Sequence, residues 1–294
     1  MHHFFAEAAD ISEREVRLRG ENLRHLKSVL RARPGERVLI SDGEGTDYEC
    51  EVAELGEEEI LLRICFREEI HELPADIWLF QGLPKSDKME LILQKAVELG
   101  VRGIVPLESR NTVVRLNPGK AAARRQRWQG IAEAAAKQSK RSIIPEVTLP
   151  MRWKDALSLL PDFSLRLIPY ENARGAERTR ELLLGLRKPW KEAARPPEGG
   201  KEAEDLKKRG DTGQRAEEKS RAKERLPLSE NEKKTPEGRR KIAVFIGPEG
   251  GFSEEEIAEA RAAGMECLSL GKRILRTETA ALCALSLLML FLED

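Results

Sequence analysis

Two segments near the C-terminus constrain the fold of this chain more than any other feature. In the first, an apolar run at 244–246 ends at Gly247, and the loop that follows leads into a helix-forming stretch. In the second, an apolar run at 268–270 ends at Gly271, and a helix-forming stretch begins near Thr277. This strand–loop–helix order places backbone amides around a ligand at the carboxyl end of a parallel sheet. Because the two loops are close in sequence, we predict that they share one pocket.

The first loop, Gly247-Pro248-Glu249-Gly250-Gly251, does not have the sequence of a phosphate-binding loop. It lacks the Lys-Ser/Thr pair of a Walker loop, its glycines do not have the dinucleotide spacing, and Glu249 would repel a phosphate. Ser253 and Glu256 have the spacing of a capping box, which predicts the start of a helix. A neutral or cationic ligand with an apolar face therefore suits this loop, although a tight turn before a helix explains the first loop alone equally well.

Apolar runs alternate with helix-forming stretches from residue 77 to the end of the chain. Strands are predicted at 77–81, 103–107, 165–169, 243–246 and 267–270, and helices at 89–99, 121–137, 257–263 and 279–292. Such alternation predicts an α/β fold in which helices cover both faces of a parallel sheet. The first 72 residues differ, because alternating strands and an Asp42-Gly43 turn predict a small antiparallel β domain.

The same two loops carry a resemblance to a known family. Residues 247–253 and 270–280 resemble the paired loops of the SPOUT class of methyltransferases. Within that class, the chain is similar to the 16S ribosomal RNA uridine-N3 methyltransferase family. Further matching segments lie upstream, at Phe4-Phe5, 23–31, 85–100, Arg127-Trp128 and 134–139. The resemblance covers nearly the whole chain except one insertion.

The resemblance implies a PUA-like RNA-binding barrel in residues 1–72 and a SPOUT methyltransferase domain in residues 75–294. In SPOUT proteins the C-terminal part threads through a loop as a trefoil knot, which is an exception to un-knotted topology. The implied reaction transfers a methyl group from S-adenosylmethionine to N3 of a uridine. The implied partners are 16S ribosomal RNA, in the assembled small subunit, and a second copy of the chain in a homodimer with the cofactor site at its interface.

We expect the cofactor to contact the backbone and the apolar side chains of the two loops and of the strand at 165–169. The expected residues are Leu167, Ile168, Pro169, Gly247, Glu249, Gly250, Leu268, Leu270, Gly271, Ile274 and Leu275. Arg276 is expected to act at the target, where a permanent cation stabilises a negative uracil oxygen or holds a phosphate. Glu278 either accepts the N3 proton or caps the final helix. Ordinary core packing explains some of the leucines equally well.

Basic residues are concentrated in two parts of a chain whose total charge is balanced, with 51 Lys plus Arg and 51 Asp plus Glu. Residues 84–141 contain 13 basic and 5 acidic residues, and the N-terminal region is also locally basic. Clustered Lys and Arg attract RNA phosphates. The expected RNA-binding residues are Arg17, Arg19, Arg24, Lys27, Arg31, Lys137, Gln138 and Arg141. A solvated helix surface explains the charge of 84–141 equally well.

Residues 188–241 interrupt the pattern with 17 basic and 12 acidic residues and no Ile, Val, Phe or Tyr. Such a segment buries too little apolar surface to offset the entropy of ordering, so we predict a disordered or loosely helical insertion. The four cysteines stand singly, which predicts no metal site or disulfide and favours a reducing, cytoplasmic location. No signal peptide is predicted, and the apolar run at 280–292 is shorter than the roughly 20 residues that span a bilayer.

Two other functions fit part of this pattern. Another SPOUT RNA methyltransferase, acting on guanine N1 or on a ribose 2′-hydroxyl, would carry the same two loops, although the segments 85–100 and 134–139 favour the uridine interpretation. A non-catalytic rRNA-binding protein with a vestigial pocket is the second alternative. The intact sequences of both loops argue against decay of the pocket.

Overall fold

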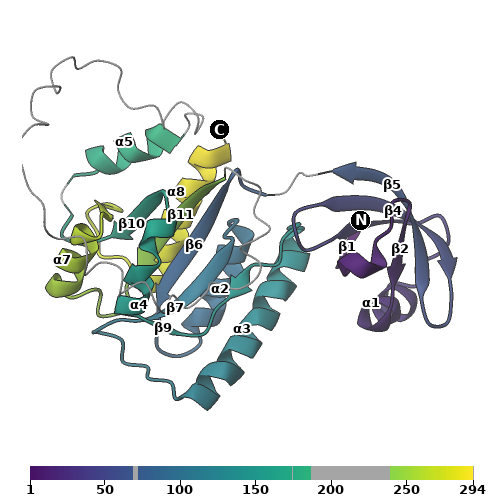
Figure 1. The fold of residues 1–294 in the computed structure, drawn as a ribbon, viewed down its shortest axis with the longest axis horizontal. Helices are drawn as coiled ribbons and strands as arrows, with labels where there is room; N and C mark the ends of the chain where they lie inside the picture. The colour runs from purple at the N-terminus through teal and green to yellow at the C-terminus, as the bar shows by residue number, and fades with distance from the viewer. Residues whose placement is uncertain (69–71, 174, 187–238, 294) are drawn as a thin grey trace, which may run out of the picture.

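The computed structural model describes residues 1–68, 72–173, 175–186 and 239–293, and these residues form two lobes, each built on one sheet (Figure 1). The predicted insertion at 188–241 lies outside the described residues except for its last three positions. Its predicted end is wrong, because strand β11 (Arg240–Ile246) already includes Arg240 and Lys241. No helix within the described ranges is both long enough and apolar enough to cross a bilayer.

The N-terminal lobe contains a five-stranded sheet in the order β1-β3-β4-β5-β2. Its strands are β1 (His2–Phe5), β2 (Glu15–Leu18), β3 (Arg37–Ser41), β4 (Asp47–Leu55) and β5 (Ile60–Glu68). The pairs are antiparallel as predicted, except that β1 runs parallel to β3. Two irregularities in the β4–β5 register bend the sheet, and Leu26, from the turn of π-helix at His25–Val29, is fully buried in its core.

The C-terminal lobe contains a parallel sheet in the order β12-β10-β11-β6-β7-β8, with β9 also paired to β7. Its other strands are β6 (Ala75–Gly82), β7 (Gly103–Glu108), β8 (Glu146–Val147), β9 (Met151–Arg152), β10 (Leu165–Pro169) and β12 (Glu266–Leu268). The helices around it are α2 (Lys88–Glu98), α3 (Pro118–Ser139), α4 (Trp153–Ser158), α5 (Glu177–Leu186), α7 (Glu254–Ala262) and α8 (Thr277–Glu293).

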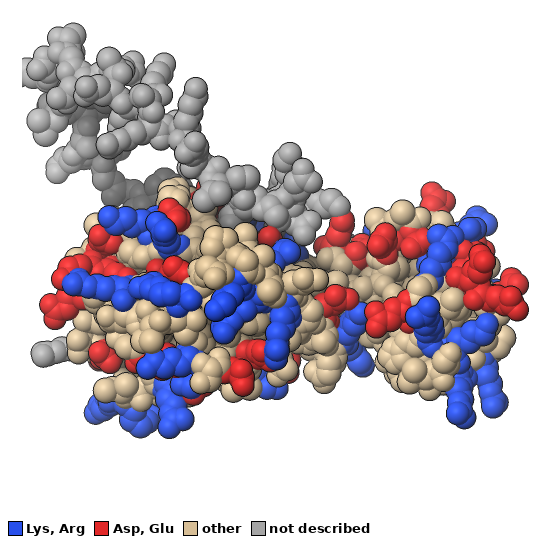
Figure 2. Space-filling view, turned by 90° about the horizontal axis from the view of Figure 1, so that it is seen from below, with Lys and Arg blue, Asp and Glu red and all other residues tan. Residues whose placement is uncertain are grey.

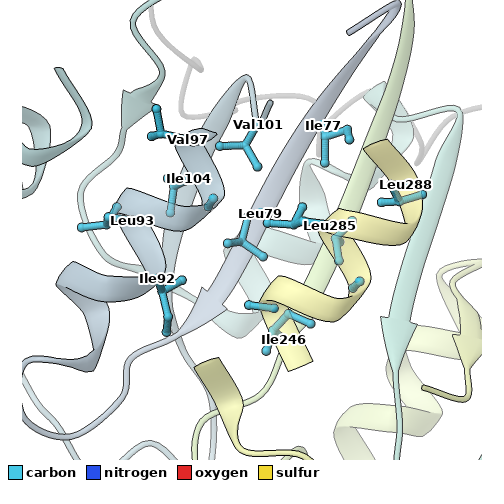
Figure 3. Close-up of a cluster of buried hydrophobic side chains, with 14 of the residues drawn as sticks. Ile77, Leu79, Ile92, Leu93, Val97, Val101, Ile104, Ile246, Leu285 and Leu288 are labelled. Atoms are coloured by element: carbon cyan, nitrogen blue, oxygen red, sulfur yellow. The ribbon is translucent and has the colours of Figure 1, made fainter. Parts of the chain in front are cut away.

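Helices cover both faces of this sheet, and β6 shows why its sequence is apolar throughout. Ile77 and Leu79 point to the face covered by α2, α3, α5 and α8, where Leu79 lies between α2 and α8 (Figure 3). Trp78 and Phe80 point to the opposite face, which α4 and α7 cover. A strand buried on both sides needs an uninterrupted apolar run rather than an alternating one. The predicted α/β fold class, with a β-rich N-terminal domain, is confirmed.

The end of the chain returns from the edge of the sheet to its middle. Strand β12 lies at the edge next to β10, whereas α8 packs against α2, β6 and β11. The intervening residues 269–276 therefore run back past the end of β11. This return brings the two glycine-hinged loops together in the C-terminal part of the chain, which the resemblance predicts to be knotted.

The two lobes are joined by polar contacts at one end of α3. Ser142 Oγ donates to Asp47 Oδ2 at 2.7 Å, and Ile143 pairs with the backbone at Gly43 and Glu44. Phe5 of β1 belongs to the core beneath α3, although it comes from the N-terminal sheet. These contacts fix the N-terminal lobe against the parallel-sheet lobe.

Candidate cofactor site and reaction centre

The two loops predicted to share a pocket lie side by side at the carboxyl end of the sheet. We call residues 247–253, between β11 and α7, the first loop, and residues 269–276, between β12 and α8, the second loop. Thr277 Oγ1, at the start of α8, donates to the Gly247 carbonyl at 2.6 Å. A cavity of about 360 Å³ opens between them, lined by both loops, by the end of β10 and by Lys88. The prediction of one shared pocket is confirmed.

The first loop is held from outside by the β7–α3 connection. Asn111 Nδ2 donates to the carbonyls of Gly250 and Gly251, at 2.9 and 3.3 Å. The predicted capping box at Ser253 and Glu256 is present, and Glu256 also accepts a 2.7 Å hydrogen bond from the Arg110 amide. The loop is therefore anchored both to its own helix and to a neighbouring strand end.

The end of β6 supports the first loop from beneath at Gly82. A Cβ atom at Gly82 would lie 2.4 Å from Pro248 N and 2.8 Å from the Gly247 carbonyl carbon. Only glycine permits so close an approach of two backbones. The neighbouring Gln81 side chain is fully buried and donates to Thr277 Oγ1 at 2.9 Å, which continues the chain of hydrogen bonds to Gly247.

The second loop is far more exposed. Gly271 adopts φ of 114°, and Ile274 exposes 83% of its surface at the cavity rim although it is apolar. Arg273 and Arg276 line the cavity beside it. Ser269 is the best-anchored residue, because its backbone exchanges hydrogen bonds with the Thr179 hydroxyl at 3.0 and 3.2 Å. The second loop thus presents two cations and an apolar side chain to whatever enters the cavity.

Lys88 lies between two carboxylates at the cavity wall. Its ammonium is 3.1 Å from Glu249 Oε1 and 3.6 Å from Glu278 Oε2. The pKa of the Glu249 carboxyl lies below its ordinary value. Partial burial alone would raise this pKa, but hydrogen bonds from the backbone amides of Glu249 and Lys85 and from Lys88 outweigh the effect of burial. Glu249 is therefore a carboxylate with little tendency to accept a proton.

The structure separates the predicted cofactor residues into two groups. Those that line the cavity are Pro169, Gly247, Glu249, Leu270, Gly271, Ile274 and Leu275. Leu167, Ile168 and Leu268 do not line this cavity, because their side chains are buried in the two covered faces of the sheet, and their contact with the cofactor stays a prediction. Gly250 is also outside the cavity wall and faces Asn111 instead.

The two predicted catalytic residues differ in position. Arg276 lines the cavity, and its role there stays a prediction. Glu278 lies in the first turn of α8, and its carboxylate is mostly buried beside Lys88. That position fits a carboxylate at a helix N-terminus rather than one that reaches into the cavity.

Apart from Arg141, the predicted RNA-binding residues divide into those that are exposed and those whose side chains contact other residues of the chain. Arg24, Arg31 and Gln138 are exposed. Arg17 and Arg19 both lie near Glu59, Lys27 donates to the Gly56 carbonyl, and Lys137 pairs with Glu133.

Arg141 does not have the exposed position that RNA contact requires. Its side chain is buried, donates to Glu72 and to the carbonyls of Val97 and Val101, and therefore anchors the link between the lobes. This burial corrects the expectation that Arg141 contacts RNA.

Several residues of the site were not identified from the sequence. Tyr170, Glu171 and Phe252 line the cavity, and the Phe252 ring packs 5.2 Å from the Trp153 ring. The end of the strand at 165–169 was a usable signal for Tyr170 and Glu171, because ligand contacts follow directly after parallel strands. Phe252 had no such signal, since its contact with Trp153 depends on the packing of α4.

Comparisons with known proteins agree with this geometry. A family model described as an RNA methyltransferase domain matches residues 71–213 and 193–289, and an RNA methyltransferase PUA domain matches residues 18–65. The ribosomal RNA small subunit methyltransferase E of Bacillus subtilis is 30% identical over 269 residues, which cover 91% of this chain and 86% of that protein. This chain belongs to the ribosomal RNA small subunit methyltransferase E family. A relative from Synechocystis is 29% identical and is matched over 97% of this chain and 76% of its own length.

Solved structures of similar proteins extend the comparison to the methyltransferase E fold. The Neisseria gonorrhoeae ribosomal RNA small subunit methyltransferase E, bound to S-adenosyl methionine, superposes with a TM-score of 0.67 at 28% identity, covering 97% of this chain and 95% of that one. A putative methyltransferase from Legionella pneumophila, in complex with its cofactor SAM, gives 0.65 at 26% identity, with 98% and 96% covered. Both lobes of the chain are therefore included in the similarity.

Proposed function

We propose that this enzyme transfers the methyl group of S-adenosylmethionine to N3 of a uridine in 16S ribosomal RNA. The observation that carries the proposal is the cavity between the two loops, which is lined by Arg276 and by the hydrogen-bonded residues Thr277 and Gly247. Membership of the methyltransferase E family supports the same reaction.

The residues of the cavity suit S-adenosylmethionine. Its volume, about 360 Å³, is in the range of roughly 300–1,000 Å³ typical of small-molecule sites. Pro169, Phe252 and Leu270 offer apolar surface for an adenine ring, and both loops offer backbone amides and carbonyls. When bound, S-adenosylmethionine supplies a methyl group on a positively charged sulfur, and the ionised Glu249 lies in the same wall.

Arg276 and Glu171 have the properties that uridine-N3 methylation requires. N3 of uracil carries a proton, so some group must accept it or stabilise the negative charge that its loss leaves on the uracil oxygens. Arg276 is a permanent cation in the cavity wall and serves the second purpose. Glu249 does not suit proton acceptance, because the Lys85 amide and the Lys88 ammonium already donate to its carboxylate. We assign proton acceptance to Glu171, an exposed carboxylate of the wall that forms no ion pair within the described ranges.

Recognition of the RNA is assigned to exposed cations of both lobes. Arg24 and Arg31 of the N-terminal lobe and Arg124 of α3 are exposed. Lys and Arg side chains are interspersed with Asp and Glu on the face in Figure 2. We therefore base the assignment on individual exposed cations rather than on the net charge of a surface. We take 16S RNA in the assembled small subunit as the substrate, which places the enzyme in the cytoplasm.

We further propose that the enzyme works as a homodimer. Ile274 at the cavity rim exposes 83% and Leu290 near the end of α8 exposes 54% of its surface, and both positions suit burial by a second copy. Sedimentation equilibrium should give twice the chain mass of 33.2 kDa, whereas a single chain mass at micromolar concentration would contradict the dimer.

Methylation of isolated small subunits tests the reaction. Subunits from cells that lack the gene are incubated with the enzyme and S-adenosylmethionine, and their nucleosides are analysed by mass spectrometry. The proposal predicts 3-methyluridine at one site. A methylated guanine or a 2′-O-methyl ribose would instead support a different RNA target, and cofactor binding without any methylation would support a non-catalytic RNA-binding role.

A further inference from the structure

Lys88 has a position that its local sequence does not favour. It is the first residue of helix α2, where the positive end of the helix dipole opposes a cation. Its side chain is half-buried, with 32% exposed, in the wall of the cavity. A cation at this place needs compensation from other parts of the chain.

Two carboxylates from different loops provide that compensation. Glu249 belongs to the first loop and lies 3.1 Å from the Lys88 ammonium. Glu278 follows the second loop in the first turn of α8 and lies 3.6 Å away. The β6–α2 turn adds a further contact to Glu249, because the Lys85 amide donates to both carboxylate oxygens, at 3.0 and 3.3 Å. Lys88 therefore joins three chain segments that surround the cavity.

Glu278 depends on Lys88 more than Glu249 does. Its side chain is 15% exposed, and Oε2, the atom nearest Lys88, is buried without a hydrogen-bond partner among the described residues. Removing the cation would leave a buried carboxylate without its neighbouring positive charge, which favours an outward movement of α8. Such a movement changes the start of α8, where Thr277 donates to the Gly247 carbonyl beside the cavity.

We propose that Lys88 is a positioning residue that holds the two loops in register, so that one cofactor molecule can contact both. The inference rests on the proposed cofactor site for its functional consequence but not for its structural one. Lys88 acts through Glu249 and Glu278, and Arg276 remains the cation assigned to the substrate.

Lys88→Met tests the proposal, with Lys85→Met as its matched control. The Lys85 side chain is exposed, and its contact with Glu249 is made by the backbone amide, which the substitution keeps. Hydrogen exchange of the free protein should become at least tenfold faster for amides of the first loop and of the first turn of α8 in Lys88→Met, and should be unchanged in Lys85→Met. Unchanged exchange in Lys88→Met would overturn the proposal.

Affinity for S-adenosylmethionine, measured by calorimetry, is the functional measurement. Lys88→Met should bind roughly 10- to 100-fold more weakly, and Lys88→Arg should recover most of the loss. If the wild-type enzyme binds no S-adenosylmethionine, the proposed function fails, while hydrogen exchange still decides the role of Lys88. If Lys88→Met does not fold, Glu278→Gln takes its place. In this variant, hydrogen exchange should be faster than in the wild type at the start of α8 and unchanged in the first loop. Wild-type exchange rates in both segments would contradict the proposal.

Discussion

The two loops of the cofactor site differ in how the protein holds them. The first loop is fixed from several directions, by Asn111, by Lys85 and Lys88, and by the Glu256 capping box. The second loop is anchored mainly at its ends, by Ser269 and by Thr277. Its middle is exposed, and Ile274 has little protein around it. The first loop is therefore a firmly anchored wall of the cavity, whereas the second loop carries the residues to which we assign contact with substrate, cofactor or a second copy of the chain.

This difference follows from where each loop lies in the sheet. The first loop leaves β11, which is paired on both sides, so neighbouring strand ends surround it. The second loop leaves the edge strand β12 and crosses to α8, so one side of it faces solvent. Substitutions under the first loop should thus lower stability, whereas substitution of a cavity-lining cation in the second loop should change activity more than stability.

The largest effect is expected at Arg276. Arg276→Ala should lower kcat about 100- to 1,000-fold, because it removes the cation to which we assign stabilisation of the developing negative charge. The affinity for S-adenosylmethionine and the melting temperature should change little, since the side chain is exposed. Lys272→Ala, at an exposed cation of the same loop, is the control and should stay near wild-type activity. Wild-type kcat in Arg276→Ala would remove this residue from the reaction.

A comparison of two carboxylates sharpens the assignment of the proton acceptor. Glu171→Gln should lower kcat about 100-fold, in the usual range for loss of a general base. Glu278→Gln should act more on cofactor affinity than on kcat, because its carboxylate lies outside the cavity wall. The pH dependence of kcat distinguishes the two, since only Glu171→Gln should lose the acidic limb of the profile. The reverse pattern would return Glu278 to the role of proton acceptor.

Gly82→Ala tests the rigid support of the first loop. The added methyl group would overlap the backbone at Pro248, so the free energy of unfolding should fall by about 1–3 kcal/mol and cofactor affinity should fall with it. Gly130→Ala, at an exposed position in α3 with nothing within 4 Å of the new Cβ, should instead stabilise by about 0.5–1 kcal/mol. Chemical denaturation measures both. Equal stability of the two variants would show that the first loop is not rigidly supported.

The smallest effect is expected from Glu249→Gln, and it depends on pH. Because the pKa of Glu249 is lowered in the folded protein, its stabilisation is complete above the pKa of the unfolded carboxyl and is lost as pH falls through the folded value. The substitution should cost about 1 kcal/mol of unfolding free energy near neutral pH. The cost should shrink towards zero in acid. A difference independent of pH would mean that the carboxylate charge does not hold the loop.

The sequence predicted the fold best where a single signal was sufficient. The apolar run of β10 gave the correct bounds, Leu165–Pro169, and Ser253 with Glu256 gave the correct helix start. Strands β8 and β9 were not predicted, because two residues each are too few to show a period. The alternation of residues along a single strand also could not show that the side chains of Leu167 and Leu268 point into a covered face of the sheet rather than into the cavity.

The remaining site residues depend on contacts between distant segments. Lys88 meets Glu249 and Glu278 only after the chain returns from β12 to α8, and Gly82 meets Pro248 only because β6 lies beside β11. Arg141 illustrates the opposite error, since local charge predicted an exposed cation whereas the lobe junction buries it. Pairings of this kind are set by topology and leave little trace in local sequence.

A crystal structure of the full chain with S-adenosylmethionine tests the central claim most directly. We predict that the ligand lies between the first and second loops, with its adenine against Leu270 and its sulfur on the side of Arg276. Electron density for the ligand elsewhere on the chain, with this cavity filled only by solvent, would contradict the assignment of the site.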